Sequence, residues 1–132
     1  MQSEPVLSSQ VAALFADPKH AGRPESGSFR HGRGGAVKTG TLIELWLSVQ
    51  NNQITAAHFE VFGCPSAIAC AEWLCRWLIG RDTGAAAQLT GLDLAAALAL
   101  AAEKRSVALL TEDALKAALT GSAHLEFGMT GG

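Results

Sequence analysis

The sequence predicts an α+β fold in which an antiparallel hairpin is accompanied by helices. Apolar and polar residues alternate over residues 41–49, which is the period of a strand with one buried face. Residues 54–62 form a second predicted strand, and the polar segment 50–53 between the two predicts the turn of an antiparallel hairpin. The side chains of the first strand that are expected to face the core are Ile43, Leu45, Leu47 and Val49.

Before and after the hairpin, apolar residues recur at the spacing of helices. The first helix is expected over residues 8–16 and ends where Asp17 precedes a proline, because a residue before proline avoids the helical conformation. The helix after the hairpin is expected over residues 66–79, with Glu72 and Arg76 one turn apart on its solvent-exposed edge. Further helical segments are predicted at residues 85–90, 94–103 and 106–119.

Two segments lack hydrophobic periodicity. Residues 17–40 are rich in Gly, Pro, Ser, Arg and His, and are predicted as a long loop that is either functional or mobile. Residues 121–132 are predicted as a flexible tail. Residues 1–132 together are expected to form a single domain, because a chain of this length can bury a core of its own and 48% of its residues are hydrophobic.

Composition limits the classes of partner. The formal net charge of −2 gives no electrostatic reason to expect nucleic acid or an anionic membrane. The longest apolar stretch, residues 94–102, is too short to span a bilayer, and the N-terminus lacks the basic and apolar regions of a signal peptide. Three cysteines without a secretory signal favour free thiols in a reducing compartment, so a cytoplasmic protein is expected.

The cysteine with the clearest chemical setting is Cys64. It follows Gly63, which permits a sharp exit from the strand, and precedes Pro65, which suits the first position of a helix. A helix N-terminus favours the thiolate form of a cysteine, which is the form that attacks sulfur and binds metals. A functional Cys64 is therefore favoured over a relic of an ancestral site. Cys70 is expected to fill the core, and Cys75 either packs there or acts as a resolving thiol for Cys64.

The segment 62–69, Phe-Gly-Cys-Pro-Ser-Ala-Ile-Ala, resembles the cysteine box of the iron–sulfur cluster assembly scaffolds of the NifU N-terminal/IscU type. Trp77 and Gly80 match the residues that close the family's next helix, and residues 17–22 and 111–119 resemble two further family segments. This resemblance implies a three-stranded antiparallel sheet with helices packed on one face. It also implies a place in iron–sulfur or sulfur metabolism, with a cysteine desulfurase or other iron–sulfur assembly proteins as partners.

The chain departs from the family pattern at most of the cluster ligands. The family builds its site from three cysteines with an aspartate and a histidine nearby, and Cys64 matches the middle cysteine. At the other ligand positions Thr39 replaces a cysteine and Thr41 the aspartate, while Ser106 and Val107 replace a His-Cys pair. The segment 100–104, which corresponds to the family's chaperone-recognition segment, keeps only its ends, Leu100 and Lys104.

These departures decide which chemistry is plausible. An iron–sulfur cluster or a closed zinc site needs about four ligand atoms, which one cysteine cannot supply. One alternative is a homodimer in which both chains contribute Cys64 and glutathione or histidines supply the other ligands. Such a dimer could bind a cluster or a single iron or zinc ion. His31, a few residues before the degenerate first motif, is the candidate replacement ligand, and its alternative is a solvated loop histidine. A sulfur acceptor, by contrast, needs only one activated thiolate.

Three hypotheses follow for the function. The first is a scaffold-like protein without turnover of its own, which carries sulfur or iron through Cys64. The second is a non-catalytic interaction or regulatory protein that binds a cysteine desulfurase or a true scaffold. The third is a sulfur carrier that works through the terminal Gly131-Gly132, which resembles the diglycine end of ubiquitin-like sulfur carriers.

Overall fold

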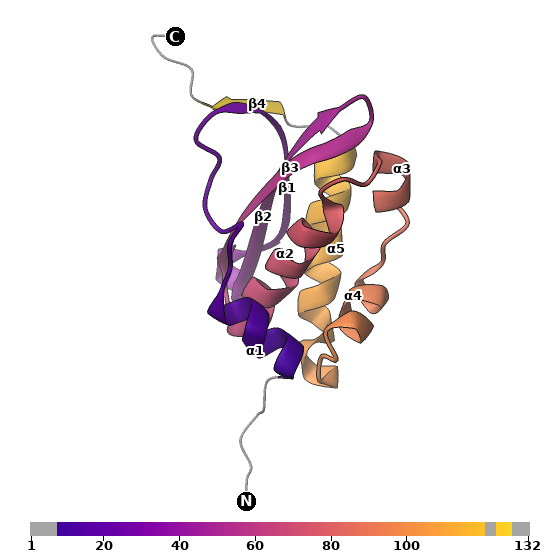
Figure 1. Ribbon diagram of the computed structural model, residues 1–132. Coiled ribbons are helices and arrows are strands. Elements are labelled where there is room, and N and C mark those ends of the chain that lie inside the picture. The colour runs from indigo at the N-terminus through magenta and orange to yellow at the C-terminus, as the bar shows by residue number, and fades with distance from the viewer. Residues whose placement is uncertain (1–7, 121–123, 128–132) are drawn as a thin grey trace, which may run out of the picture.

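The computed structural model describes residues 8–120 and 124–127. After α1, the strands β1 to β3 come first along this part of the chain, and a run of helices follows before the short β4 (Figure 1). In chain order the elements are α1 Ser9–Ala16, β1 Gly27–Ala36, the 3-10 helix η1 Val37–Thr39, β2 Thr41–Gln50, β3 Gln53–Phe62, α2 Pro65–Leu78, α3 Thr83–Ala86, α4 Gly91–Ala97, the 3-10 helix η2 Ala102–Lys104, α5 Arg105–Thr120 and β4 His124–Phe127.

The described strands form an antiparallel sheet in the order β3-β2-β1-β4. Helices α2 and α5 lie side by side against one face of this sheet, α1 packs on α2, and α4 packs on α5 (Figure 1). The α+β class with helices on one face is therefore confirmed. The core of the sheet is β1, β2 and β3, and the short β4 extends it beyond β1.

The core lies between the sheet and helices α2 and α5. Ile43, Leu45 and Leu47 are fully buried on the face that the alternating pattern of residues 41–49 predicts, and Val49 is half-buried at the end of the strand. From the helices, Leu74 and Leu115 pack into the same cluster. Burying each such side chain stabilises the fold by about 2 kcal/mol, so this face fixes the register of the hairpin.

The prediction that residues 17–40 form one long loop is wrong, because β1 (Gly27–Ala36) occupies the second half of that segment. Gly32 and Gly34 lie on its inward face, where a Cβ atom would overlap the backbone of α5. Glycine at these positions lets α5 approach the sheet closely. The same absence of side chains removes the alternating apolar pattern by which a strand is recognised in the sequence.

The chain after α2 also differs from the expected helices. The capping box of Thr90 and Asp93 begins α4 at Gly91, ahead of the predicted start, and the helix ends at Ala97. Ala99 then adopts a positive φ of 51°, which breaks the single helix predicted over 94–103 into α4 and η2.

Part of the predicted tail is a strand. Residues 124–127 form β4, which pairs with β1 from Gly27 to Arg30. The rest of that segment, including Gly131-Gly132, lies outside the described residues. Among the helices of residues 8–120, none has the length and apolar character needed to cross a bilayer.

Candidate functional site

Cys64 is the N-cap residue of α2. β3 ends at Phe62, Gly63 makes the turn, and Pro65 occupies the first helical position. The carbonyl of Cys64 accepts the first helical hydrogen bonds, from the amides of Ala67 at 3.0 Å and Ile68 at 3.3 Å. The Cys64 side chain is half-buried, so the thiol is held at the positive end of the helix and still reaches solvent.

A lysine from a distant part of the chain faces this thiol. Lys104, at the end of η2, places Nζ 3.7 Å from the Cys64 Sγ. Burial raises the pKa of Cys64, but the amide of Ala67, the charge of Lys104 and the amide of Ser66 act in the opposite direction and together lower that pKa below its usual value. The geometry thus favours a thiolate on Cys64, which is the nucleophilic form of cysteine.

The other cysteines have the opposite environment. Cys70 and Cys75 are fully buried within α2. Burial raises the pKa of Cys70 to about 12, and burial together with the charge of Glu72 raises the pKa of Cys75 well above its usual value. Both thiols remain protonated at neutral pH and act as small apolar side chains in the core, as expected for buried free cysteines.

Of the first pair of degenerate family positions, Thr41 lies close to the cysteine turn in the fold. Thr41 begins β2, and its hydroxyl and methyl groups lie 3.5 Å and 3.4 Å from where a Cβ on Gly63 would be. Thr39 is exposed in η1, and its hydroxyl donates to the carbonyl of Ala36 at 2.9 Å. Neither threonine offers a ligand atom of the kind that iron or zinc prefers.

The second pair stands at the beginning of α5. Ser106 is exposed and Val107 is buried, so neither supplies a thiolate or imidazole. From this part of the chain Lys104 reaches Cys64. An ammonium group cannot act as a metal ligand, and Cys64 alone supplies one of about four ligand atoms, so the surroundings of this thiol do not fit a cluster or a zinc ion held by one chain.

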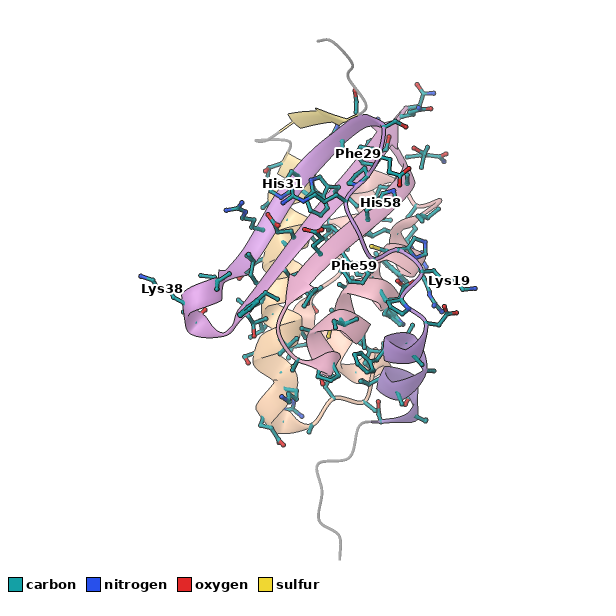
Figure 2. The ribbon with its side chains drawn as sticks, turned by 90° about the vertical axis from the view of Figure 1, so that its left-hand side faces the viewer. Lys19, Phe29, His31, Lys38, His58 and Phe59 are labelled. Carbon is teal, nitrogen blue, oxygen red and sulfur yellow. The ribbon has the colours of Figure 1, made fainter. Side chains whose placement is uncertain are left out.

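His31 lies elsewhere. Because residues 27–36 form a strand, its side chain projects from the outer face of the sheet, where it stacks on Trp46 with ring centroids 5.1 Å apart (Figure 2). Its Nε2 atom is 3.2 Å from the Glu44 carboxylate, and the side chain is 13% exposed. His31 pairs with Trp46 in the middle of β2, whereas Cys64 lies beyond the end of β3, at the start of α2. The structure therefore does not bring His31 to Cys64. Within the described part of the chain, no group of three or more His, Cys, Asp or Glu side chains is arranged to hold a metal ion.

A sequence profile described as the NifU-like N terminal domain matches residues 7–124. The chain belongs to this family. It is 34% identical over 124 residues to the "Iron-sulfur cluster assembly enzyme IscU" of Drosophila melanogaster, covering 90% of this chain and 80% of that protein. It is 32% identical over 115 residues to the "Iron-sulfur cluster assembly scaffold protein IscU" of Rickettsia prowazekii, covering 85% and 88%.

Solved structures of the same kind share the fold of this NifU-like domain. One is described as an iron–sulfur cluster assembly scaffold protein for the SUF system from Fervidobacterium islandicum, with a TM-score of 0.66, 17% identity, and coverage of 85% of this chain and 95% of that one. Another is the N-terminal part of a NifU-like protein from Brucella abortus, with a TM-score of 0.62, 13% identity, and coverage of 86% and 91%. At these identities the likeness shows the fold alone.

The structure corrects the expected position of Glu72. This side chain is fully buried, and its carboxylate accepts the backbone N–H of His20 at 2.8 Å and the Nε of Arg76 at 2.7 Å. The Nδ1 atom of His20 lies 2.6 Å from the same carboxylate. Glu72 thus fastens the segment before β1 to α2 instead of facing solvent. The i,i+4 spacing of Glu72 and Arg76 was visible in the sequence, but the third partner came from a segment without periodicity.

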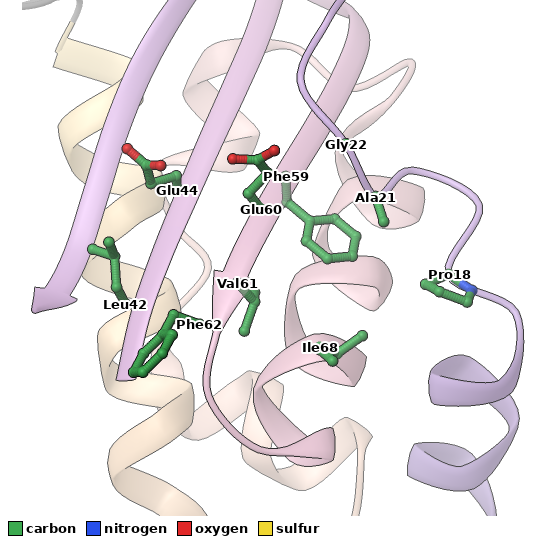
Figure 3. Close-up of a pocket in the computed structure, with 10 residues that line it drawn as sticks. All are labelled: Pro18, Ala21, Gly22, Leu42, Glu44, Phe59, Glu60, Val61, Phe62 and Ile68. Carbon is green, nitrogen blue, oxygen red and sulfur yellow. The ribbon is translucent and has the colours of Figure 1, made fainter. Parts of the chain in front are cut away.

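A groove follows the outer edge of β3 next to the cysteine turn (Figure 3). Its volume is about 410 Å³. The sequence gave no sign of this groove, because its walls come from four separate segments: the segment before β1, β2, β3 and α2. The lining residues are Pro18, Ala21, Gly22, Leu42, Glu44, Phe59, Glu60, Val61, Phe62 and Ile68. We refer to this feature as the edge groove.

Proposed function

We propose that this NifU-like domain takes part in iron–sulfur cluster assembly as a scaffold-like protein without turnover of its own, and that Cys64 accepts sulfur as a persulfide. The observation that carries the proposal is the half-buried Cys64 thiol at the N-terminus of α2, with Lys104 Nζ 3.7 Å away. The proposal is also supported by the relatives, which are named as iron–sulfur cluster assembly proteins.

The sulfur-accepting step needs no further group from this chain. The Cys64 thiolate attacks the outer sulfur of a persulfide on a donor protein, and a new S–S bond forms to Sγ as the S–S bond of the donor breaks. The electron pair of the broken bond leaves on the donor thiolate, so the step involves no net oxidation. The Lys104 ammonium stabilises negative charge on Cys64 before the step and on the new persulfide after it.

The donor that this chemistry requires is a protein that forms a cysteine persulfide, such as a cysteine desulfurase, and we place the exchange in the cytoplasm. Iron or an assembled cluster would be cargo held between chains, because Cys64 of one chain supplies one of about four ligands. A homodimer or another assembly protein would then supply the remaining ligands.

A second candidate is an interaction protein that keeps the scaffold shape and regulates a desulfurase or a true scaffold. The replacement of ligand positions by Thr39, Thr41 and Val107 favours it, because these side chains cannot restore a cluster site. It differs from the first candidate in requiring nothing of Cys64.

The two candidates are separated by loading the protein with sulfur. Wild type, Cys64→Ser and the buried-cysteine control Cys70→Ala are purified without oxygen and incubated with a cysteine desulfurase and cysteine, with and without iron. Persulfide is located by mass spectrometry of alkylated peptides, and iron and acid-labile sulfide are quantified.

Persulfide on Cys64 in wild type and Cys70→Ala, absent from Cys64→Ser, is the expected result. Iron and sulfide that depend on Cys64 would extend the role to cluster binding. If neither persulfide nor iron appears on well-folded wild type, the sulfur-acceptor function is wrong and the interaction protein becomes the better account.

A further inference from the structure

The Cys64 thiol and the Lys104 amine are brought together by two parts of the fold that are distant in the sequence. Cys64 stands at the N-terminus of α2, and Lys104 is the last residue of η2, which leads directly into α5. Nζ lies 3.7 Å from Sγ, and both side chains are half-buried. Because α2 and α5 pack on each other and on the sheet, the starting points of the two helices are held in this relation. A nitrogen nucleophile is thus placed beside whatever group forms on the sulfur.

The Cys64 sulfur reaches solvent, so a small oxidant can reach it. The thiolate attacks one oxygen of hydrogen peroxide, the O–O bond breaks and hydroxide leaves. The sulfur is oxidised to a sulfenic acid and the peroxide is reduced. More peroxide then converts the sulfenic acid to a sulfinic acid irreversibly, unless a nucleophile displaces its hydroxyl group first. The fate of oxidised Cys64 therefore depends on which nucleophile is nearest.

The other thiols of the chain do not reach Cys64. The chain has three cysteines, and Cys70 lies six positions further along α2, a helical rise of about 9 Å. Disulfides join residues whose Cα atoms are at most about 7 Å apart. Cys75 lies still further along the same helix, and both thiols are buried. A disulfide within the chain is therefore not available to oxidised Cys64.

The backbone beside Cys64 offers no substitute. A sulfenic acid can also condense with a nearby backbone nitrogen to form a sulfenamide. The nitrogen that follows Cys64 belongs to Pro65, which carries no hydrogen and cannot react in this way. The N–H of Ala67 is already donated to the Cys64 carbonyl at 3.0 Å. In the described part of the chain, the nucleophile placed at this sulfur is the amine of Lys104.

We propose that Cys64 and Lys104 form a modification site, at which oxidation by a peroxide joins Sγ and Nζ in a sulfenamide crosslink. The Lys104 ammonium first gives a proton to solvent, and the neutral amine attacks the sulfur of the sulfenic acid. An S–N bond forms as the S–OH bond breaks, and the leaving hydroxide departs as water with a second amine proton. This condensation involves no net oxidation, because the peroxide has already supplied it. The flexible four-carbon side chain of lysine lets Nζ cover the remaining distance.

Thiols reverse the crosslink. A small thiol attacks the Cys64 sulfur, the S–N bond breaks, and the released Lys104 nitrogen takes up a proton. A second thiol then displaces the first from the mixed disulfide and frees the Cys64 thiolate. The crosslink thus protects Cys64 from irreversible oxidation and withdraws it from sulfur exchange while it lasts. The effect on sulfur exchange rests on the proposed function, whereas formation of the crosslink does not.

The test is to treat the reduced full-length protein with hydrogen peroxide, without a desulfurase. Wild type is expected to become lighter by two hydrogen atoms in intact mass. Digestion should then yield a pair of peptides joined through Cys64 and Lys104, which dithiothreitol separates. Cys64→Ser should form no such pair, and Cys70→Ala should form it as wild type does.

Replacing the amine without removing the charge makes the test specific. Lys104→Arg keeps a cation beside Cys64, but its guanidinium stays protonated and is no nucleophile. This variant should accumulate sulfenic acid, seen as at least about tenfold more dimedone adduct on Cys64 than in wild type, because it lacks the pre-positioned amine. The matched control is Lys116→Arg, whose parent lysine pairs with Glu112 on α5, and it should behave as wild type.

The proposal is overturned if folded wild type yields no peptide pair joined through Cys64 and Lys104. It is also overturned if wild type and Lys104→Arg trap equal amounts of dimedone, or if the two lost hydrogen atoms map to a disulfide. Circular dichroism before treatment shows that each protein is folded, and the peptide pair in wild type decides the matter without any variant.

The outcome is separate from that of the proposed function. Persulfide on Cys64 of untreated protein, with no crosslink after peroxide, removes the modification site alone. A crosslink in a protein that takes up no persulfide removes the sulfur-acceptor role alone. Where both hold, peroxide treatment of wild type should lower persulfide loading at least about tenfold, and dithiothreitol should restore it, because the crosslinked sulfur is no longer a thiolate.

Discussion

Replacing Lys104 by methionine removes the charge that faces Cys64 and should raise the pKa of that thiol. The Nζ–Sγ distance is 3.7 Å, and at that distance two unit charges interact by about 1 kcal/mol in a water-like dielectric. That limit is appropriate because the thiol is only half-buried. An energy of about 1 kcal/mol corresponds to about a fivefold loss of thiolate at a pH below the pKa, so the pKa of Cys64 rises.

The assay is the rate of alkylation of Cys64 by iodoacetamide as a function of pH. The rate follows the thiolate, so it rises with pH to a plateau, and the midpoint of the rise is the pKa. In the wild type this midpoint should lie below that of an ordinary thiol, since the helix amides and Lys104 lower the pKa of Cys64. In Lys104→Met it should move to higher pH.

Two controls make the result specific to the charge at Lys104. Lys104→Arg keeps a cation and should leave the midpoint near the wild-type value. Lys116→Met removes a lysine that is paired with Glu112 on α5, and should have no effect on Cys64. A midpoint that stays in place or falls in Lys104→Met would refute the assignment of Lys104 as the residue that stabilises the thiolate.

Three further substitutions test the packing that holds the site. Gly34→Ala should lower the free energy of unfolding by about 1–3 kcal/mol in urea titration, because its Cβ overlaps the backbone of α5; a stable variant would show that α5 can move away from β1. Glu72→Ala should cost about 3 kcal/mol, measured in the same way, because it leaves the His20 amide and Arg76 without their carboxylate; a cost below about 1 kcal/mol would contradict the buried clamp. Thr90→Ala should cost about 1 kcal/mol and lower the melting temperature, through loss of the α4 capping box, and an unchanged melting temperature would count against that cap.

A helix or strand can be predicted from the sequence only where its side chains show the pattern typical of that element. The hairpin and the helix after Cys64 were predicted within a residue or two, because β2 alternates and α2 begins with a turn glycine and a proline. β1 was missed because its inward positions are glycines, which carry no hydrophobic pattern. That error also misplaced His31, since a residue in a loop can approach Cys64 and a residue on the outer face of a sheet cannot.

The surroundings of Cys64 could likewise be predicted from the sequence only in part. The turn and the helix N-terminus could be predicted from neighbouring residues, but Lys104 lies 40 positions away and only the tertiary fold brings it to the thiol. The contact between Glu72 and His20 could not be predicted either, because His20 is 52 positions away and belongs to a segment without periodicity. Long-range polar contacts of this kind leave no local pattern in one sequence.

The number of ligand atoms around Cys64 bears on the two kinds of cargo, sulfur and iron, that we propose for a scaffold-like protein. At 3.7 Å the Lys104 ammonium attracts an anion on Sγ by about 1 kcal/mol per unit charge. A persulfide on Cys64 is an anion and gains the same interaction that the thiolate has. The residues that replace the family ligands supply no thiolate or imidazole, since Thr41 carries a hydroxyl group and Val107 is apolar and buried. A single chain therefore supplies the one thiolate that our proposed sulfur-acceptor role needs, whereas a cluster or a metal ion would require about three further ligand atoms from a second chain.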